Sequence, residues 1–291
     1  MVKPEREIGE NRLIGLIGHP VSHSVGQIFF NRLFQKLNLP CSYIAMDIHP
    51  SVLEYILRSS SHLFSGFNVT IPHKVSILAI TDSLDESARE SHNANLIRIE
   101  KKKMVSYNTD FKAILHLLSD HMVEDAKPLV FGTGGTARTV VSALLKTFSP
   151  EKIYIASRNP QRASGELQPL WKDSVEVIGY EEVRKLRMVN IISNCTPVGM
   201  QGSDYMLPLP RSIQMDPLVI DMVYTPPDTP LATWAKKHSE NVITGDMIYL
   251  EQAARTLELL CQDKDFSRSI MRDVFAESMA EAGYELSSST L

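Results

Sequence analysis

The stretch Pro128-Leu129-Val130-Phe131-Gly132-Thr133-Gly134-Gly135 decides the fold of this chain. Its four apolar residues predict a buried strand, and the glycines predict a tight turn into a helix that extends through Leu145. Glycines allow the backbone to approach a pyrophosphate, whose charge the helix N–H groups and dipole stabilise. The pattern is G-x-G-G and not the full G-x-G-x-x-G, so a purely structural turn is the alternative. A further strand at 153–156, about 20 residues later, favours a dinucleotide-binding fold of the Rossmann type.

The residues after that further strand favour NADP over NAD. An NAD enzyme usually places Asp or Glu there to hold the ribose 2′-hydroxyl. This chain has Ser157, followed by Arg158 and Arg162. An acidic residue would repel a 2′-phosphate, whereas guanidinium groups bind it well. Two solvated surface arginines are the alternative, and we expect NADP as the cofactor.

Alternating strand and helix patterns predict a separate α/β unit upstream of the glycine turn. A mainly parallel sheet covered by helices is expected there, followed by a hairpin at 97–106 and a connecting helix at 111–121. The upstream strands are expected at 13–18, 43–46 and 67–70, and the helices at 25–37 and 51–58. Downstream, strands are expected at 175–178, 189–193, 218–221 and 242–244, and helical sequence dominates 250–282.

The polar stretch 121–127 is the expected domain junction. We therefore expect an α/β substrate-binding and catalytic domain at residues 1–121 and a Rossmann-type NADP-binding domain at residues 122–249. A cleft should lie between them. The C-terminal helices at about 250–283 are expected to pack back on the first domain.

The composition is that of an ordinary globular enzyme. A chain of 291 residues is long enough for two domains. A net charge of −4 gives no basic surface of the kind that nucleic acid requires. The charged N-terminus has no signal-peptide core, no apolar run is long enough to span a membrane, and the three cysteines are widely spaced. We expect a reduced, cytoplasmic protein, monomeric or homodimeric, that binds no nucleic acid, membrane or metal.

Two polar clusters follow predicted strands in the first half of the chain. They are Asn68-Val69-Thr70-Ile71-Pro72-His73-Lys74 and Tyr107-Asn108-Thr109-Asp110. A carbonyl group that receives a hydride needs a proton on its oxygen, and the reverse reaction must remove that proton. A lysine paired with a carboxylate can perform both tasks. A lone lysine is usually a surface residue, but two polar clusters at strand ends upstream of a cofactor loop favour catalysis by Lys74 and Asp110.

In order and in spacing, the motifs of this chain resemble those of the shikimate dehydrogenase family along nearly the whole length. Residues 18–24 resemble the N-terminal substrate loop of the family, 68–74 its N-V-T-x-P-x-K motif and 108–110 its N-T-D motif. Residues 132–135 match the cofactor loop, and 157–162 are similar to its N-R-T-x-x-R segment. Residues 194–200, 221–224 and 252–254 complete the series.

The resemblance implies a role for each matching residue. Lys74 and Asp110 would be the catalytic pair. The substrate would be contacted by Ser22, Ser24, Thr70, Asn95, Tyr224 and Gln252. NADP would be held by Gly132, Thr133, Gly134, Gly135, Thr136, Ser157, Arg158 and Arg162, with Met222 and Gly245 near the nicotinamide. The implied chemistry is the reversible reduction of 3-dehydroshikimate to shikimate, in aromatic amino acid biosynthesis.

Three positions depart from the family pattern. Gly26 stands where the substrate loop usually has a second serine, so one hydroxyl donor for the substrate carboxylate is missing. Such a hydrogen bond to a charged group is worth about 1.5–3 kcal/mol. The G-A-x-N-T asparagine falls on Asn95 counting from Lys74 and on Ala94 counting from Asp110; we favour Asn95. Phe111 replaces the usual glycine after the N-T-D aspartate.

These departures leave two alternatives to a shikimate dehydrogenase. One is a relative that acts on quinate, an amino-shikimate or another polyhydroxylated cyclic acid, which Gly26 keeps open. The other is a non-catalytic NADP-binding sensor. A sensor needs neither Lys74 nor Asp110, so the presence of both argues against it.

Overall fold

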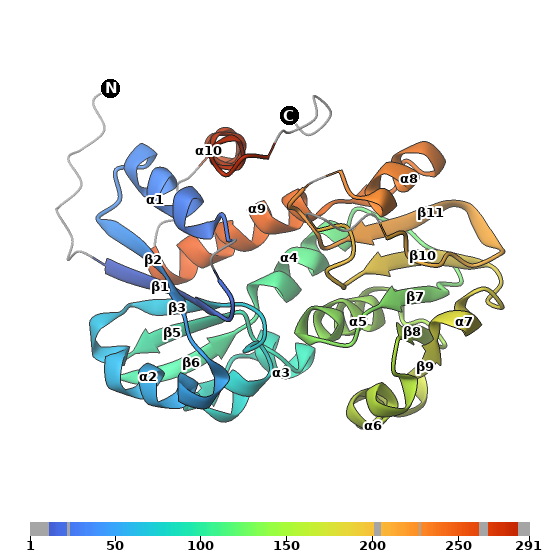
Figure 1. Cartoon of the computed structure of the whole chain (residues 1–291), viewed down its shortest axis with the longest axis horizontal. Coiled ribbons are helices and arrows are strands. Elements are labelled where there is room, and N and C mark those ends of the chain that lie inside the picture. The colour runs from blue at the N-terminus through green and yellow to red at the C-terminus, as the bar shows by residue number, and fades with distance from the viewer. Residues whose placement is uncertain (1–11, 22–23, 201–204, 227, 262–266, 285–291) are drawn as a thin grey trace.

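Two six-stranded sheets make up the described part of the chain, and they lie side by side along its long axis (Figure 1). The computed structural model describes residues 12–21, 24–200, 205–226, 228–261 and 267–284. The first sheet has the order β2-β1-β3-β5-β6-β4 and the second has the order β12-β11-β10-β7-β8-β9. This arrangement confirms the α/β class with a Rossmann-type second half.

The first sheet is mixed. Its strands are β1 (Arg12–Gly18), β2 (Cys41–Asp47), β3 (Gly66–Val69), β4 (Ser83–Leu84), β5 (Leu96–Glu100) and β6 (Lys103–Tyr107). Strands β1, β2 and β3 are parallel, whereas β5 is antiparallel to both β3 and β6, as the predicted hairpin requires. Helices α1 (Gly26–Lys36), α9 (Gly245–Thr256) and α10 (Arg268–Glu281) share one hydrophobic core with this sheet. Helices α2 (Leu53–Ser60) and α3 (Glu86–Ser91) contribute to a second core.

The second sheet is parallel throughout. Its strands are β7 (Pro128–Phe131), β8 (Ile153–Ser157), β9 (Val175–Gly179), β10 (Val189–Asn194), β11 (Ile213–Asp221) and β12 (Val242–Ile243). Helices α4 (Thr109–Leu118), α5 (Gly135–Phe148) and α6 (Pro160–Trp171) share one core with it. Helices α7 (Tyr180–Val183) and α8 (Pro230–His238) share another. Helices on both faces explain why β7 and residues 153–156 of β8 are continuous apolar runs.

Helix α4 connects the two sheets. It begins directly after β6, where the side chain of Asn108 accepts a hydrogen bond from the Phe111 N–H at 2.9 Å. The Phe111 ring is fully buried in the core of the second sheet, although its helix starts at the end of the first. Phe111, in the position that usually holds glycine, therefore anchors α4 to the second sheet.

Several element boundaries differ from the sequence expectations. Helix α9 begins at Gly245, five residues before the predicted start, and α4 spans Thr109–Leu118 and not 111–121. Helices α6 and α8 were not expected at all. Both start with a proline that follows a capping side chain, Asn159 or Thr229, which is a helix-start signal that could have revealed them.

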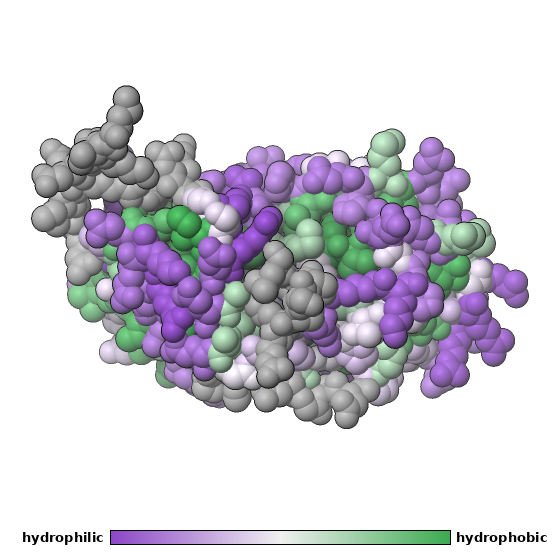
Figure 2. Space-filling model, turned by 90° about the horizontal axis from the view of Figure 1, so that it is seen from above, coloured by the Kyte–Doolittle hydropathy of each residue, from purple (hydrophilic) through white to green (hydrophobic). Residues whose placement is uncertain are grey.

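The outer surface seen from above is mainly hydrophilic, with smaller groups of hydrophobic residues between the polar ones (Figure 2). Within the described ranges, no helix is both long and apolar enough to cross a membrane.

Candidate active site

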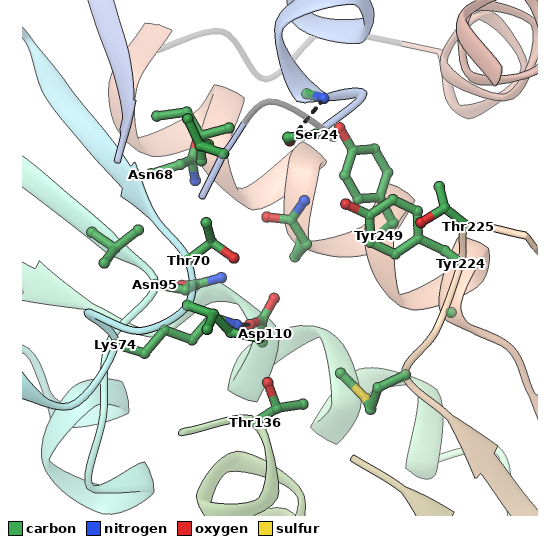
Figure 3. A pocket seen from close by; sticks show the side chains of 18 of the residues that line it. Ser24, Asn68, Thr70, Lys74, Asn95, Asp110, Thr136, Tyr224, Thr225 and Tyr249 are labelled. Carbon is green, nitrogen blue, oxygen red and sulfur yellow. Dashed lines mark hydrogen bonds and ion pairs between the residues drawn. The ribbon is translucent and has the colours of Figure 1, made fainter. Parts of the chain in front are cut away.

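A cavity of about 450 Å³ lies where elements of the two halves meet. Its walls come from β1, β3 and α1 of the first half, from α4, and from the segments that follow β10 and β11 in the second half. Most of the predicted catalytic and substrate residues line it, together with three of the predicted cofactor residues (Figure 3). These residues are Ser24, Thr70, Lys74, Asn95, Asp110, Thr136, Met222, Tyr224, Gly245 and Gln252. Ser22 lies outside the described residues.

Lys74 and Asp110 form an ion pair in the cavity wall. The ammonium Nζ donates to Asp110 Oδ2 at 2.7 Å, and the two side chains are 15% and 10% exposed. Lys74 stands in the turn after β3, where its carbonyl accepts from the Ala94 N–H at 2.8 Å. Asp110 is in the first turn of α4. Because little water screens this pair, its charges interact more strongly than a surface pair would. The pair can hold, donate and accept a proton at the cavity surface.

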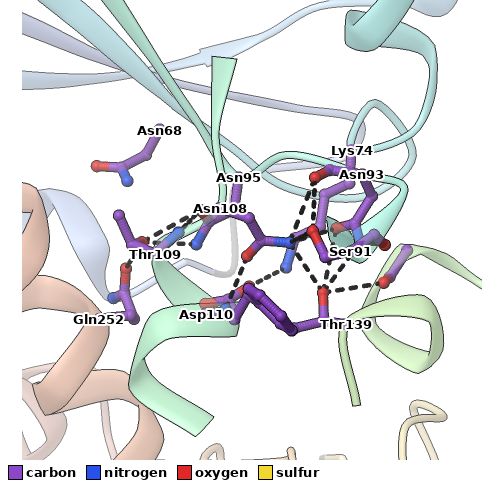
Figure 4. A network of polar contacts seen from close by, with 12 residues as sticks. Asn68, Lys74, Ser91, Asn93, Asn95, Asn108, Thr109, Asp110, Thr139 and Gln252 are labelled. Carbon is purple, nitrogen blue, oxygen red and sulfur yellow. Dashed lines mark hydrogen bonds and ion pairs between the residues drawn. The ribbon is translucent and has the colours of Figure 1, made fainter. Parts of the chain in front are cut away.

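A buried polar network lies behind this pair (Figure 4). The Asn108 Nδ2 atom is 2.7 Å from Ser91 Oγ, 3.1 Å from Asn93 Oδ1 and 3.0 Å from Thr139 Oγ1. Asn93 Nδ2 also donates to Thr139 Oγ1 at 3.0 Å. Since Thr139 belongs to α5 of the second half, these hydrogen bonds hold α5 against the segments that carry Lys74 and Asp110.

Of the two candidates for the family asparagine position, Asn95 reaches the cavity and Ala94 does not. The Asn95 side chain lines the cavity, accepts from the Thr109 N–H at 2.7 Å and donates to Thr109 Oγ1 at 2.9 Å. Ala94 is fully buried in the core between the first sheet and α2 and α3. Asn95 is thus the residue in reach of a ligand, on the same side as Gln252, whose Oε1 is 3.4 Å from Thr109 Oγ1.

The cavity also contains polar residues that were not named as site residues from the sequence. They are His19, Tyr43, Asn68, Cys195, Thr196, Thr225 and Tyr249. Tyr43 donates its hydroxyl hydrogen to Asn68 Oδ1 at 2.9 Å. Asn68 belongs to the same motif as Thr70 and Lys74, so its motif was a usable signal. Tyr249 stands three residues before Gln252 on α9, so the motif at 252–254 was a usable signal for it as well. Tyr43 gave none, because only the packing of β2 brings it to the cavity.

Burial keeps the phenol of Tyr224 protonated. It raises the pKa of Tyr224 to about 12, and the negative charge of Asp110 adds to this effect. At neutral pH the Tyr224 hydroxyl is therefore a hydrogen-bond donor. Burial also raises the pKa of the Cys195 thiol, so this cysteine in the cavity wall is a neutral thiol and not a nucleophilic thiolate.

The glycine turn forms the start of α5, next to the Lys74–Asp110 ion pair. Gly132 has φ +111°, a conformation that favours glycine, and Gly134 is the N-cap of α5. A Cβ atom on Gly134 would meet no described atom within 4 Å, and the first turn of α5 carries no acidic residue. A Cβ atom on Gly135 would come within 2.9 Å of Lys74 Cβ. An open backbone cradle at a helix N-terminus fits a pyrophosphate.

The predicted ribose-side residues lie apart from the cavity, at the end of β8. Ser157 is buried, and its Oγ accepts from the Asn159 N–H at 3.1 Å. Arg158 is exposed. Arg162 has a side chain that is 78% exposed and an Nε atom 2.9 Å from Glu166 Oε1. Two accessible guanidinium groups beside the glycine turn fit a ribose 2′-phosphate.

Comparisons with known proteins agree on one family. Residues 16–97 match the family model described as the shikimate dehydrogenase substrate binding domain. The chain is 37% identical to a shikimate dehydrogenase (NADP(+)) of Thermoplasma acidophilum, over 93% of this chain and 97% of the other. It is 34% identical to one of Methanocaldococcus jannaschii, over 84% of this chain and 89% of the other.

Solved structures give the same result. A shikimate dehydrogenase in complex with NADP+ superposes with a TM-score of 0.79 at 30% identity, covering 92% of this chain and 95% of the other. The enzyme of Thermus thermophilus in complex with NADP(H) and shikimate superposes with a TM-score of 0.75 at 25% identity, covering 92% and 99%.

Proposed function

The chain belongs to the shikimate dehydrogenase family, and we propose that it interconverts 3-dehydroshikimate and shikimate with NADPH and NADP+. The observation that carries this proposal is the Lys74–Asp110 ion pair at 2.7 Å, in a cavity wall shared with Thr136 of the cofactor helix. The similarity to proteins named as NADP-dependent shikimate dehydrogenases supports the choice of substrate and cofactor.

Lys74 and Asp110 would move the proton in this reaction. Bound NADPH supplies a hydride to the carbonyl carbon of the substrate. Lys74 donates a proton to the carbonyl oxygen as negative charge develops there, and Asp110 orients the ammonium and balances its charge. In the reverse direction the pair accepts the hydroxyl proton. Direct contact between Nζ and Oδ2 supports this division of work.

The other predicted residues would bind and orient the two reactants. Substrate contacts are assigned to Ser22, Ser24, Thr70, Asn95, Tyr224 and Gln252. NADP contacts are assigned to residues 132–136, Ser157, Arg158, Arg162, Met222 and Gly245. The open space in front of Gly134 and the exposed arginines support the second group, and the cavity lining supports the first.

The proposal divides the chain into a substrate-binding and catalytic domain at residues 1–121 and an NADP-binding domain at residues 122–249. Helices of about 250–283 belong with the first. Support comes from the change of sheet between β6 and β7 and from the core that α9 and α10 share with the first sheet. We place the enzyme in the cytoplasm, in aromatic amino acid biosynthesis, as a monomer or homodimer.

A substrate panel read by NADPH absorbance tests the proposal. Purified protein with NADP+ should oxidise shikimate, and Lys74→Ala should lower kcat by about 10²- to 10⁴-fold. If the unaltered protein does not oxidise shikimate, the proposed substrate is wrong. An unchanged rate in Lys74→Ala would contradict the catalytic assignment.

A second candidate is a dehydrogenase of quinate, an amino-shikimate or a similar cyclic acid. The observation that favours it is Gly26, which provides no hydroxyl donor at the cavity wall beside Ser24. Quinate and an amino-shikimate belong in the same panel, and the highest kcat/KM identifies the substrate. Tight NADP binding without turnover of any acid would indicate a sensor.

A further inference from the structure

The hydroxyl group of Tyr249 is buried at the cavity without a protein partner. The ring belongs to α9 and packs against Phe29, Tyr224 and Phe275, with ring centroids 5.2, 4.8 and 5.1 Å away. The residue is 8% exposed, and among the described residues its hydroxyl has no hydrogen-bond partner. A buried hydroxyl without a partner is costly, and most such groups in proteins are satisfied. A ligand in the cavity can supply the missing partner.

Gly26 leaves a small space in front of this hydroxyl. A Cβ atom on Gly26 would lie 3.8 Å from the Tyr249 hydroxyl oxygen and 3.2 Å from Ser24 Oγ. Two hydroxyl groups therefore flank the place that a side chain at position 26 would take, and all three residues line the cavity. Figure 3 shows the Tyr249 ring pointing its hydroxyl towards Ser24 at the start of α1.

The electrostatics of this part of the cavity suit an anion. Helix α1 is 11 residues long, begins at Gly26 and has no acidic residue in its first turn, so its positive end favours an anion. Among the described cavity residues, Lys74 is the only lysine or arginine, and Asp110 neutralises it. Figure 3 places that ion pair on the other side of the cavity from Tyr249 and Ser24.

Burial also keeps the Tyr249 phenol protonated. It raises the pKa of Tyr249 well above its ordinary value, and the nearby Tyr224 and Tyr43 add to the effect. The hydroxyl is therefore available as a donor over the whole physiological pH range.

We propose that the hydroxyl groups of Tyr249 and Ser24 together bind the carboxylate of the substrate, in the space that Gly26 leaves open. Tyr249 then supplies the hydroxyl donor whose absence at position 26 the sequence comparison indicates. Anchoring the carboxylate here directs the opposite side of the ring towards Lys74 and Asp110. The inference rests on the proposed function, because it takes a cyclic hydroxy acid as the substrate.

The variant Tyr249→Phe tests the inference, since it removes one oxygen and keeps the ring packing. KM for shikimate should rise about 10- to 100-fold, as expected for a lost hydrogen bond to a charged group. The value of kcat should change by less than about threefold, and KM for NADP+ should stay constant, because the hydroxyl binds the substrate and does not act on the reacting carbon. With the methyl ester of shikimate, which lacks the negative charge, the increase in KM should be several-fold smaller.

Tyr107→Phe is the matched control. Its hydroxyl donates to Glu100 at 3.0 Å and lies outside the cavity lining, so KM should not change. Melting temperatures check the fold. Tyr249→Phe should melt at or above the temperature of the unaltered protein, because a buried group without a partner is removed. A melting temperature several degrees lower would mean that the hydroxyl has an internal partner and would overturn the inference.

The outcomes separate this inference from the proposed function. If the unaltered protein oxidises shikimate and Tyr249→Phe has the same KM, the inference is wrong and the proposed function stands. Equal increases in KM for the acid and its ester would also overturn it, since Tyr249 would then only shape the cavity. If another cyclic acid is the better substrate, the ratio of KM in Tyr249→Phe to KM in the unaltered protein is measured with that acid, and an unchanged KM overturns the inference. No turnover of any acid overturns both.

Discussion

Glu166 neutralises one of the two arginines that we assign to the ribose phosphate of NADP. Its Oε1 atom lies 2.9 Å from Arg162 Nε, one helical turn along α6, and both side chains are largely exposed. An exposed pair of this kind contributes about 0.3–0.5 kcal/mol. In the free protein the Glu166 carboxylate thus contacts the Arg162 guanidinium, which the 2′-phosphate of NADP would also contact. NADP binding therefore has to displace Glu166.

The two arginines therefore allow a paired prediction on cofactor preference. Arg158→Ala combined with Arg162→Ala should raise KM for NADP+ about 10- to 100-fold and leave KM for NAD+ nearly unchanged, because only NADP+ has the 2′-phosphate. Glu166→Gln should lower KM for NADP+ by about twofold, since Arg162 loses its competitor. Steady-state kinetics with both cofactors measure this. If the ratio of KM for NADP+ to KM for NAD+ is the same in the double variant as in the unaltered protein, the assignment of the two arginines is wrong.

Asp221 gives a prediction on the pH dependence of stability. Burial raises its pKa from 3.8 to about 6, although Thr229, the Val223 N–H and Asn194 all donate hydrogen bonds to it. The folded state therefore binds a proton more tightly than the unfolded state. This contribution to the free energy of unfolding is fully present below about pH 4 and is lost as the pH rises through about 6, at about 1.4 kcal/mol per pKa unit.

Asp221→Asn removes that titration. The free energy of unfolding of the unaltered protein should fall relative to that of the variant as the pH rises from about 4 to about 7. Urea unfolding at several pH values measures the difference. Two parallel pH profiles would show that Asp221 has the same pKa in both states.

At the level of elements, the start of α4 combines structure with chemistry. Asn108 caps the helix, joins α3 and α5 through the buried network and stands two residues before Asp110. The loss of an N-cap costs about 0.5–2 kcal/mol, and buried partners left unsatisfied add about 1–3 kcal/mol.

Asn108→Ala should therefore destabilise the protein by about 3 kcal/mol and also lower kcat, because Asp110 loses its fixed position relative to Lys74. Asn159→Ala, which removes the cap of α6 at an exposed site, should cost less than about 1 kcal/mol. Urea unfolding of both variants gives the comparison. Equal losses would mean that the buried network adds nothing to the cap.

The elements also show what sequence patterns can predict. The first strands of the second sheet were predictable because a parallel sheet covered on both faces leaves uninterrupted apolar runs, such as residues 128–131. Strand β4 has only two residues and no pattern of its own. Helix α9 contains Asp246, Glu251 and Gln252 on buried positions, so its apolar periodicity is weak and its start was predicted too late.

At the level of the whole molecule, the chain returns to its first sheet after completing the second. Helix α10 inserts Phe275 among Phe29, Tyr224 and Tyr249, with ring centroids 6.1, 6.4 and 5.1 Å away. Both tyrosines line the cavity. The last helix thus supports one wall of the active site from behind.

Phe275→Ala should destabilise the protein by about 3–5 kcal/mol, as for other buried aromatic residues. KM for the substrate should rise, because Tyr224 and Tyr249 lose their packing, whereas NADP binding by the distant second sheet should persist. Leu63→Ala, at a position that is 60% exposed, is the control and should change stability by less than about 0.5 kcal/mol. If Phe275→Ala loses affinity for both the substrate and NADP, the packing of α10 stabilises the second sheet as well as the first.

The same return of the chain explains which site residues the sequence could not reveal. Polar clusters at strand ends predicted Lys74 and Asp110, since the ends of neighbouring strands meet at one edge of a sheet. Thr70 and Asn95 were predicted from the family resemblance. Tyr43 lies on β2, and Tyr249 comes from α9, more than a hundred residues from any motif of the first sheet. The place of Tyr43 at the cavity depends on tertiary packing and has no local sequence pattern, whereas Tyr249 lies one helical turn before the predicted residue Gln252.

The close approach of Gly135 to Lys74 limits how freely the two halves can be recombined. A methyl group at position 135 would come within 2.9 Å of Lys74 Cβ and within 3.5 Å of Asn93 Oδ1. A chimaera that takes its cofactor half from another Rossmann-type protein would therefore inherit activity only if the donor also has glycine there. For an engineer who wishes to exchange one coenzyme specificity for another, the residues after β8 are the positions to change, and the glycine turn before α5 is the part to keep.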